Sequence, residues 1–148
     1  MEDYLDFKEF VVALNKHKVE YLIVGAHALA HLGCPRLTGD LDVLVRPTTE
    51  NGNRIVAALD EFGVATLGFK PTEFAEPGAV FQIGVQPVRI DLMTEISGVT
   101  WEEAQAGREE GLFENEPTYF VGREQFIANK RSLGRPKDLA DIDVITKK

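Results

Sequence analysis

The pattern of apolar and polar positions predicts a chain in which short helices alternate with short strands. Residues 3–17 carry apolar side chains at near-helical spacing, which predicts an amphipathic helix. Residues 20–24 form a compact run rich in β-branched and aromatic side chains that ends at Gly25, and this run predicts a buried strand. Small apolar residues over 26–32 predict a short helix, which Gly33 closes.

A second strand and a longer helix are predicted next. The segment 34–39 has loop composition, and residues 40–45 read as a strand of alternating acidic and apolar positions. After this strand, a helix is expected to begin at Thr48 or Thr49, which serves as its N-cap, and to end at about Phe62.

The second half of the chain predicts a strand pair and a helical end. Prolines and a glycine interrupt residues 64–78, which favours a short strand followed by a loop. The other predicted elements are paired strands at 79–83 and 88–93, a short helix at 101–106, strand pieces at 112–113 and 119–121, and helices at 123–133 and 136–146.

These elements predict one domain over residues 1–148, with a C-terminal helical segment over about 123–148. The connection between strands 20–24 and 40–45 is too short for a parallel crossover through a long helix. The predicted fold class is therefore α/β (α+β), with a small mixed β-sheet and helices packed on one side.

Composition and charge limit the kinds of partner and the cell compartment that are expected for the chain. The net charge of −8 argues against a broad nucleic-acid surface, although residues 123–148 hold seven basic and four acidic side chains. Cys34 is the single cysteine, which excludes an internal disulfide and suits a reducing cytoplasm. No apolar run approaches the roughly 20 residues that span a membrane, and the first residues lack signal-peptide features, so a cytoplasmic protein is expected.

Three aspartates are the most informative polar positions. Asp40 and Asp42 are two apart in a predicted strand, so their side chains share a face and their Cα atoms lie roughly 6.6 Å apart. Asp91 interrupts a second apolar strand, and pairing of the two strands would gather three carboxylates in one patch. Such oxygen ligands suit Mg²⁺ or Mn²⁺. The alternative is a set of solvated strand residues, with Asp91 guarding a sheet edge.

The turn at Gly25 is a candidate phosphate site. A strand, a glycine and then a helix leave backbone N–H groups free to bind phosphate, although most such glycines only form turns. His27 and His31 share a helical face as zinc ligands do, but no third ligand is near in sequence, which favours packing histidines.

The order of these features resembles a known family. The run 22–26, thirteen intervening residues, Asp40-Leu-Asp42 and the strand residue Asp91 resemble the nucleotidyltransferase superfamily of DNA polymerase β-like enzymes. Residues 36–42 look like the small stand-alone members, including those of abortive-infection toxin systems. The tail 130–141 is similar to the Lys/Arg-rich endings of those proteins.

This resemblance implies an enzyme that moves a nucleoside monophosphate from a nucleoside triphosphate to an acceptor, with Mg²⁺ or Mn²⁺ as cofactor. The acceptor stays open among a small molecule, a protein and a tRNA end. Ala26 stands where the family has Gly or Ser, so a catalytically degenerate domain that binds nucleotide or a partner protein, within a toxin–antitoxin pair, is the alternative. The implied catalytic and metal-binding residues are Asp40, Asp42 and Asp91, and the implied nucleotide-binding residues are Gly25, Ala26, Thr38, Lys130 and Lys137.

Overall fold

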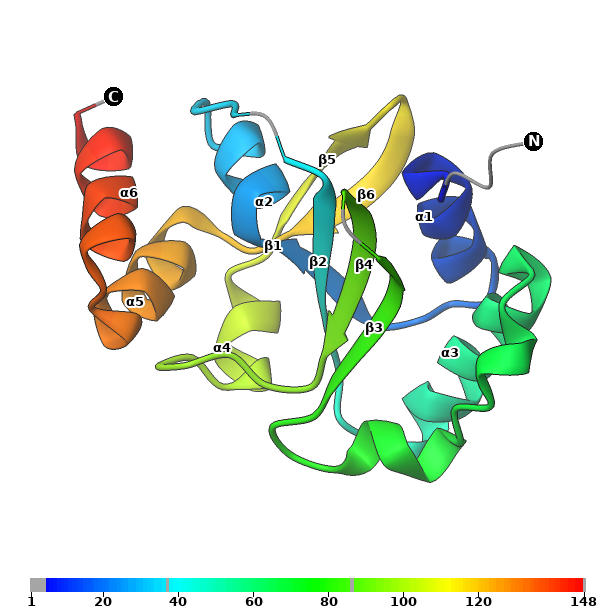
Figure 1. Cartoon of the computed structure of the whole chain (residues 1–148). Coiled ribbons are helices and arrows are strands. Elements are labelled where there is room, and N and C mark those ends of the chain that lie inside the picture. The colour runs from blue at the N-terminus through cyan, green and yellow to red at the C-terminus, as the bar shows by residue number, and fades with distance from the viewer. Residues whose placement is uncertain (1–4, 37, 86, 148) are drawn as a thin grey trace.

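One mixed sheet organises the chain in a computed structural model, which describes residues 5–36, 38–85 and 87–147. Within these residues the sheet has six strands in the order β3-β4-β2-β1-β6-β5 (Figure 1). β2 pairs with β4 in parallel, and so does β1 with β6, while the other neighbours are antiparallel. The strands are β1 (Tyr21–Val24), β2 (Asp40–Val45), β3 (Val80–Val85), β4 (Val88–Met93), β5 (Glu109–Phe113) and β6 (Glu116–Phe120).

The helices follow the predicted positions closely. None of the helices in the described part of the chain is long and apolar enough to cross a membrane. The C-terminal helical segment is confirmed as a pair of helices joined at Gly134, which has a left-handed φ of 65°. The helices are α1 (Phe7–Lys16), α2 (Gly25–His31), α3 (Thr49–Phe62), α4 (Trp101–Ala106), α5 (Arg123–Leu133) and α6 (Pro136–Thr146).

The segment 64–78 differs from its prediction. It contains two 3₁₀ helices, Ala65–Leu67 and Pro71–Ala75, and no strand. The Glu73 carboxylate accepts a hydrogen bond from the Lys70 backbone N–H at 2.7 Å, which caps the second of them. Phe74 is fully buried against α3, so tertiary packing outweighs the strand propensity of this segment.

Helices cover both faces of the sheet, where the sequence predicted one. All four residues of β1 are buried, so each face of this central strand needs a cover. Tyr21 and Ile23 pack into one core with α1 and α3, which lie together on one side in Figure 1. Leu22 and Val24 pack into a second core with α2, α4, α5 and α6 on the other side.

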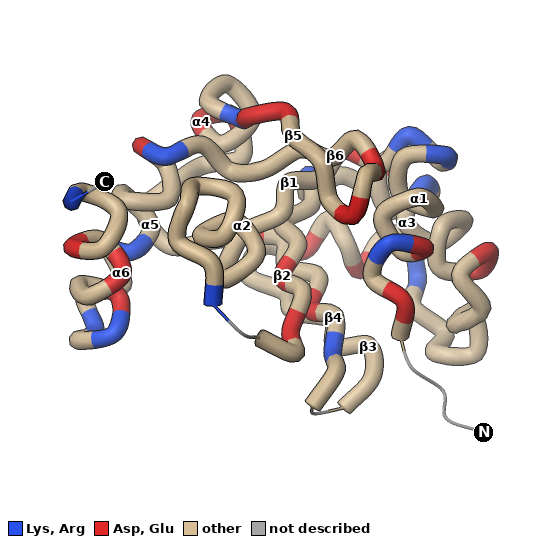
Figure 2. Tube along the Cα trace, turned by 90° about the horizontal axis from the view of Figure 1, so that it is seen from above, with Lys and Arg blue, Asp and Glu red and all other residues tan. Residues whose placement is uncertain are grey.

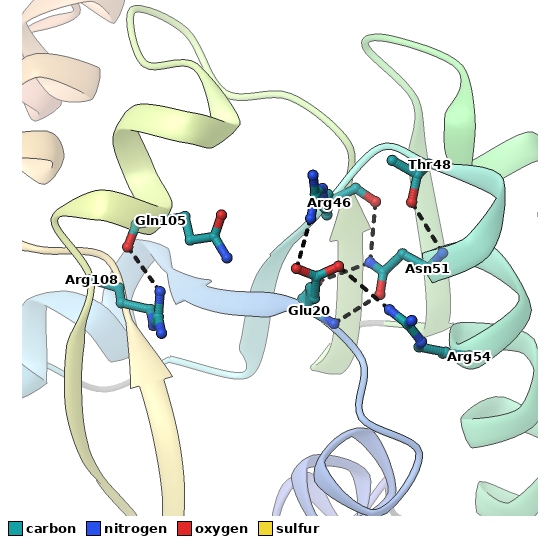
Figure 3. Close-up of polar contacts among 7 residues, drawn as sticks. All are labelled: Glu20, Arg46, Thr48, Asn51, Arg54, Gln105 and Arg108. Carbon is teal, nitrogen blue, oxygen red and sulfur yellow. Dashed lines mark hydrogen bonds and ion pairs between the residues drawn. The ribbon is translucent and has the colours of Figure 1, made fainter.

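Asn51 of α3 holds the start of β1 and the end of β2 together (Figure 3). Its side chain is fully buried, donates to the carbonyl oxygens of Glu20 (3.0 Å) and Arg46 (3.1 Å), and accepts from the Glu20 N–H (2.8 Å). Thr48 is the N-cap and accepts from the Asn51 N–H at 3.1 Å. The Glu20 carboxylate in turn binds Arg46 (3.0 Å) and Arg54 (3.4 Å).

Replacing Asn51 by Ala is expected to lower the free energy of unfolding by about 3 kcal/mol, because three hydrogen bonds to the backbone are lost, each worth about 1 kcal/mol. Urea unfolding followed by circular dichroism measures the change. Thr48→Ala is the matched control and removes a single cap worth about 1 kcal/mol. Equal losses in the two variants would contradict a clamping role for Asn51.

Candidate functional site

The register of the central strands brings the three predicted aspartates together. On β2, Asp42 pairs with Asp91 of the parallel strand β4 and with Val24 of β1, while Asp40 pairs with Arg89. Neighbouring strands lie about 4.8 Å apart, so paired residues point their side chains from the same face at short range. The carboxylate patch expected from the sequence is therefore present at this end of the sheet.

Arg89 completes the cluster and was not anticipated from the sequence. Its Nε donates to Asp91 Oδ1 at 2.9 Å and its Nη2 to Asp91 Oδ2 at 3.1 Å, a two-point ion pair. The same Nη2 lies 3.4 Å from Asp40 Oδ2. These hydrogen bonds raise the pKa of Arg89. The signal was available, because positions 89 and 91 are two apart in a strand and share a face.

Asp42 is the aspartate of the cluster whose negative charge is destabilised by its surroundings. Burial, followed by the repulsion of Asp91 and Asp40, raises the pKa of Asp42 to about 6, and Lys130 and Arg89 offset this effect in part. Arg89 compensates a single one of the three negative charges, so the donor set fits a hard divalent cation.

The carboxylates do not already surround one point. In the described part of the chain, no three His, Cys, Asp or Glu side chains converge closely enough to hold a metal ion. The ion pairs explain the spread, because Arg89 draws Asp91 and Asp40 toward its own guanidinium. Metal binding at this trio therefore requires a change in these side-chain positions.

Gly25 allows the chain to pass directly beside Asp42. It follows β1, has a φ of +70°, and a Cβ built on it would lie 2.3 Å from Asp42 Oδ2. Any other residue would meet both the left-handed backbone and the carboxylate. The glycine predicted as a turn residue is thus required by the position of the aspartate itself.

A basic cavity of about 210 Å³ opens beside this turn, between α2, α5 and α6. Figure 2 shows the basic positions of α5 and α6 beside α2, across from the acidic positions of β2. The cavity therefore joins a half-buried carboxylate to a positively charged wall. Its lining includes the turn residues Gly25 and Ala26, Asp42, and the basic side chains of Arg36, Lys130, Arg135 and Lys137.

Two aspartates of α6 hold three of these basic side chains in place. Asp138 is fully buried and binds Arg135 at two points, 2.5 and 3.1 Å. Lys130 Nζ lies 3.7 Å from Asp138 and 3.9 Å from Asp141, and Arg36 donates to Asp141. Asp138 therefore contacts Arg135 and Lys130, and Asp141 contacts Arg36 and Lys130.

The remaining candidates lie outside the cavity wall. Thr38 accepts a hydrogen bond from the Asp40 N–H at 3.1 Å and so shapes the start of β2. His31 stacks on Phe120 at 4.2 Å, and His27 packs edge-on against Phe113 at 5.3 Å, as expected of packing histidines.

A larger groove of about 740 Å³ lies between α1 and the β5–β6 hairpin, away from the aspartates. Asn15 of this groove already binds Tyr21 (2.8 Å), Glu116 (2.9 Å) and the Pro117 carbonyl (2.7 Å). Size alone therefore does not identify the site, and the convergence of unbalanced charges favours the smaller cavity.

Comparison with known proteins identifies the fold. No protein-family model and no curated protein sequence matches the chain. A proposed nucleotidyltransferase from Thermotoga maritima, TM1012, superposes with a TM-score of 0.60 at 13% identity, over 95% of this chain and 88% of that one. ANT(2″)-Ia in complex with adenylyl-2″-tobramycin superposes with a TM-score of 0.59 at 14% identity, over 95% and 86%. The solution structure of the antibiotic-resistance factor ANT(2″)-Ia gives 0.58 at 14% identity, over 95% and 80%.

The chain has the nucleotidyltransferase fold. The resemblance drawn from the sequence is thereby confirmed at the level of the fold, and the matches extend over nearly the whole chain. Identities this low leave the activity of this nucleotidyltransferase-fold chain to be argued from its own residues.

Asp42→Asn is expected to stabilise the metal-free protein by about 2 kcal/mol above pH 6. The folded pKa of Asp42, about 6, exceeds its ordinary value of 3.8, so ionisation opposes folding. This penalty is absent below about pH 4, grows between pH 4 and 6, and is constant above.

Urea unfolding with a chelator at pH 4 and pH 7.5 checks this prediction, and the gain should appear only at pH 7.5. Asp60→Asn is the control, because Asp60 is exposed on α3, where substitutions change stability by less than about 0.5 kcal/mol. A gain of the same size at both pH values would contradict the electrostatic explanation.

Proposed function

We propose that this chain is a Mg²⁺-dependent nucleotidyltransferase, which moves a nucleoside monophosphate from a nucleoside triphosphate to a hydroxyl group of an acceptor. The observation that carries the proposal is the meeting of the Asp42 carboxylate and the Gly25 turn with four basic side chains in one cavity. A triphosphate needs both features, since a divalent cation bridges its oxygens and basic groups balance the remaining charge.

Asp40, Asp42 and Asp91 are the residues that would hold the Mg²⁺. Their oxygen ligands and their excess of negative charge, expressed in the raised pKa of Asp42, fit such an ion. When bound, the ion polarises a phosphoryl oxygen and stabilises the charge that develops during transfer.

The protein's own groups position the reactants. Gly25 leaves room for the Asp42 carboxylate directly beside the turn, and Lys130 and Arg36, held by Asp141, present positive charge in the cavity. The acceptor oxygen attacks the α-phosphorus, the bond from this phosphorus to the bridging oxygen breaks, and pyrophosphate leaves toward the basic side chains. The proton of the acceptor hydroxyl passes to a carboxylate of the trio.

The structural relatives support the use of a nucleoside triphosphate by this chain, but they do not identify its acceptor. ANT(2″)-Ia has been seen with adenylyl-2″-tobramycin, the adenylylated form of a small molecule. At 14% identity this favours a nucleoside triphosphate as donor here, and the acceptor remains open among a small molecule, a protein and a tRNA end.

The test is thermal unfolding of the wild type with each nucleoside triphosphate, with and without Mg²⁺. A ligand at a hundred times its dissociation constant stabilises the fold by about 2.7 kcal/mol. This corresponds to roughly 5–10 °C for a chain of this size. Asp42→Asn should lose the Mg²⁺-dependent shift, and Asp60→Asn should keep it.

Transfer itself is measured as pyrophosphate release with candidate acceptors, and Asp42→Asn should abolish it. The competing interpretation, a degenerate domain that binds nucleotide or a partner protein, rests on Ala26, which lacks the hydroxyl that Ser would provide. A Mg²⁺-dependent shift with no transfer to any acceptor would favour nucleotide binding alone. No shift with any nucleotide, from a well-folded protein, would favour a partner protein.

Lys130→Gln is expected to raise the dissociation constant of the Mg²⁺–nucleotide complex roughly 10- to 100-fold, because one charge-assisted contact to phosphate is lost. Isothermal titration calorimetry measures the constant. Lys16→Gln is the matched control, since Lys16 pairs with Glu61 on the opposite side of the sheet. An equal change in both variants would argue that the effect is one of net charge rather than of a contact in the cavity.

A further inference from the structure

Arg89 occupies the position in the trio where a cation is needed. Its guanidinium donates hydrogen bonds to both carboxylate oxygens of Asp91, at 2.9 and 3.1 Å, and to Asp40 at 3.4 Å. The pair is shielded from water, with 22% of the Arg89 side chain and 11% of the Asp91 side chain exposed. An ion pair held at two points and shielded in this way is screened little by salt.

The position of Arg89 bears on how many metal ions the trio can take. Sites with two metal ions place them about 3.5–4 Å apart across shared carboxylates. A second ion bound to Asp91 would lie within about 5 Å of the guanidinium, since ligand distances are about 2.1 Å for Mg²⁺. A cation at that range repels the ion strongly in a partly buried site.

We propose that Arg89 is a built-in cation that takes the place of a second divalent ion, so that each chain binds a single divalent ion at the aspartate trio. This inference rests on the proposed function. Arg89 is then a positioning residue, which holds the Asp91 carboxylate in place in the absence of a second ion. The hydrogen bonds of Arg89 go to Asp91 and Asp40, while Asp42 pairs in register with Asp91 on the neighbouring strand.

The geometry explains why the positive charge comes from an arginine. Asp40 and Asp91 lie on different strands, and Arg89 pairs in register with Asp40 while it shares a face with Asp91. The planar guanidinium bridges the two carboxylates with separate N–H groups. A lysine at the same position would supply a point charge without the two-point contact.

The experiment counts bound Mn²⁺ from the signal of free Mn²⁺ in electron paramagnetic resonance. Wild type, Arg89→Gln and Arg89→Lys are titrated alone and with the α,β-methylene analogue of each of the four common nucleoside triphosphates. We expect one ion per chain in the wild type and in Arg89→Lys. Arg89→Gln should bind a second ion at least tenfold more tightly than the wild type does.

Arg46→Gln is the matched control. Arg46 also pairs with a carboxylate, Glu20 at 3.0 Å, but at the opposite end of the same strands (Figure 3). The Arg46→Gln variant should bind one ion per chain, as we expect of the wild type. The count in the wild type needs no variant, so the inference stays testable if Arg89→Gln folds poorly.

Two ions in the wild type, or one ion in well-folded Arg89→Gln, would overturn the role of Arg89. Either result leaves the proposed function intact, provided that Asp42→Asn abolishes the binding of Mn²⁺. Failure of the proposed function looks different, because the wild type would then bind no Mn²⁺ with any analogue, and both proposals would fall together.

Discussion

The placement of like charges on adjacent strands is the constraint on which the rest of the site depends. The β2–β4 register sets Asp42 against Asp91, and carboxylates so close on one sheet face repel each other. Gly25 has no Cβ because one would collide with the Asp42 carboxylate. Arg89 lies against Asp91. Lys130 of the C-terminal helices lies near enough to offset part of the rise in the pKa of Asp42. Each of these features follows from the need to tolerate the cluster.

A cluster of this kind lowers the free energy of unfolding of the metal-free protein. Packing elsewhere in the fold compensates for this loss. β1 is buried on both faces, and two separate cores pack against the sheet. Burial of apolar surface contributes roughly 25 cal/mol per Å², so each core of buried aliphatic and aromatic side chains outweighs one strained carboxylate. Repulsion among the aspartates is therefore tolerated in a sheet whose other positions are apolar and well packed.

The sequence predicted what depends on local pattern and missed what depends on distant contacts. Strand periodicity placed Asp40 and Asp42 on one face, and the helices at 101–106, 123–133 and 136–146 were placed at their observed bounds. The role of Arg89 depends on pairing across 49 residues, and that of Asp141 on a partner 105 residues away. The two-sided helix arrangement was likewise missed, because an apolar strand such as 21–24 does not reveal which helix will cover each face.

The two ends of the central strands differ in how completely their acidic side chains are paired. At one end Glu20 is matched by Arg46 and Arg54, and the buried amide of Asn51 has partners for its oxygen and its nitrogen (Figure 3). At the other end Arg89 offsets a single charge of three, and Asp42 keeps a raised pKa. Since stability alone favours complete pairing of buried charge, a metal-bound ligand at the unbalanced end would stabilise the fold there, as the proposed function requires. A strand end in which every charge is paired has no such need, which is why the smaller, charged cavity and not the larger groove is assigned as the site.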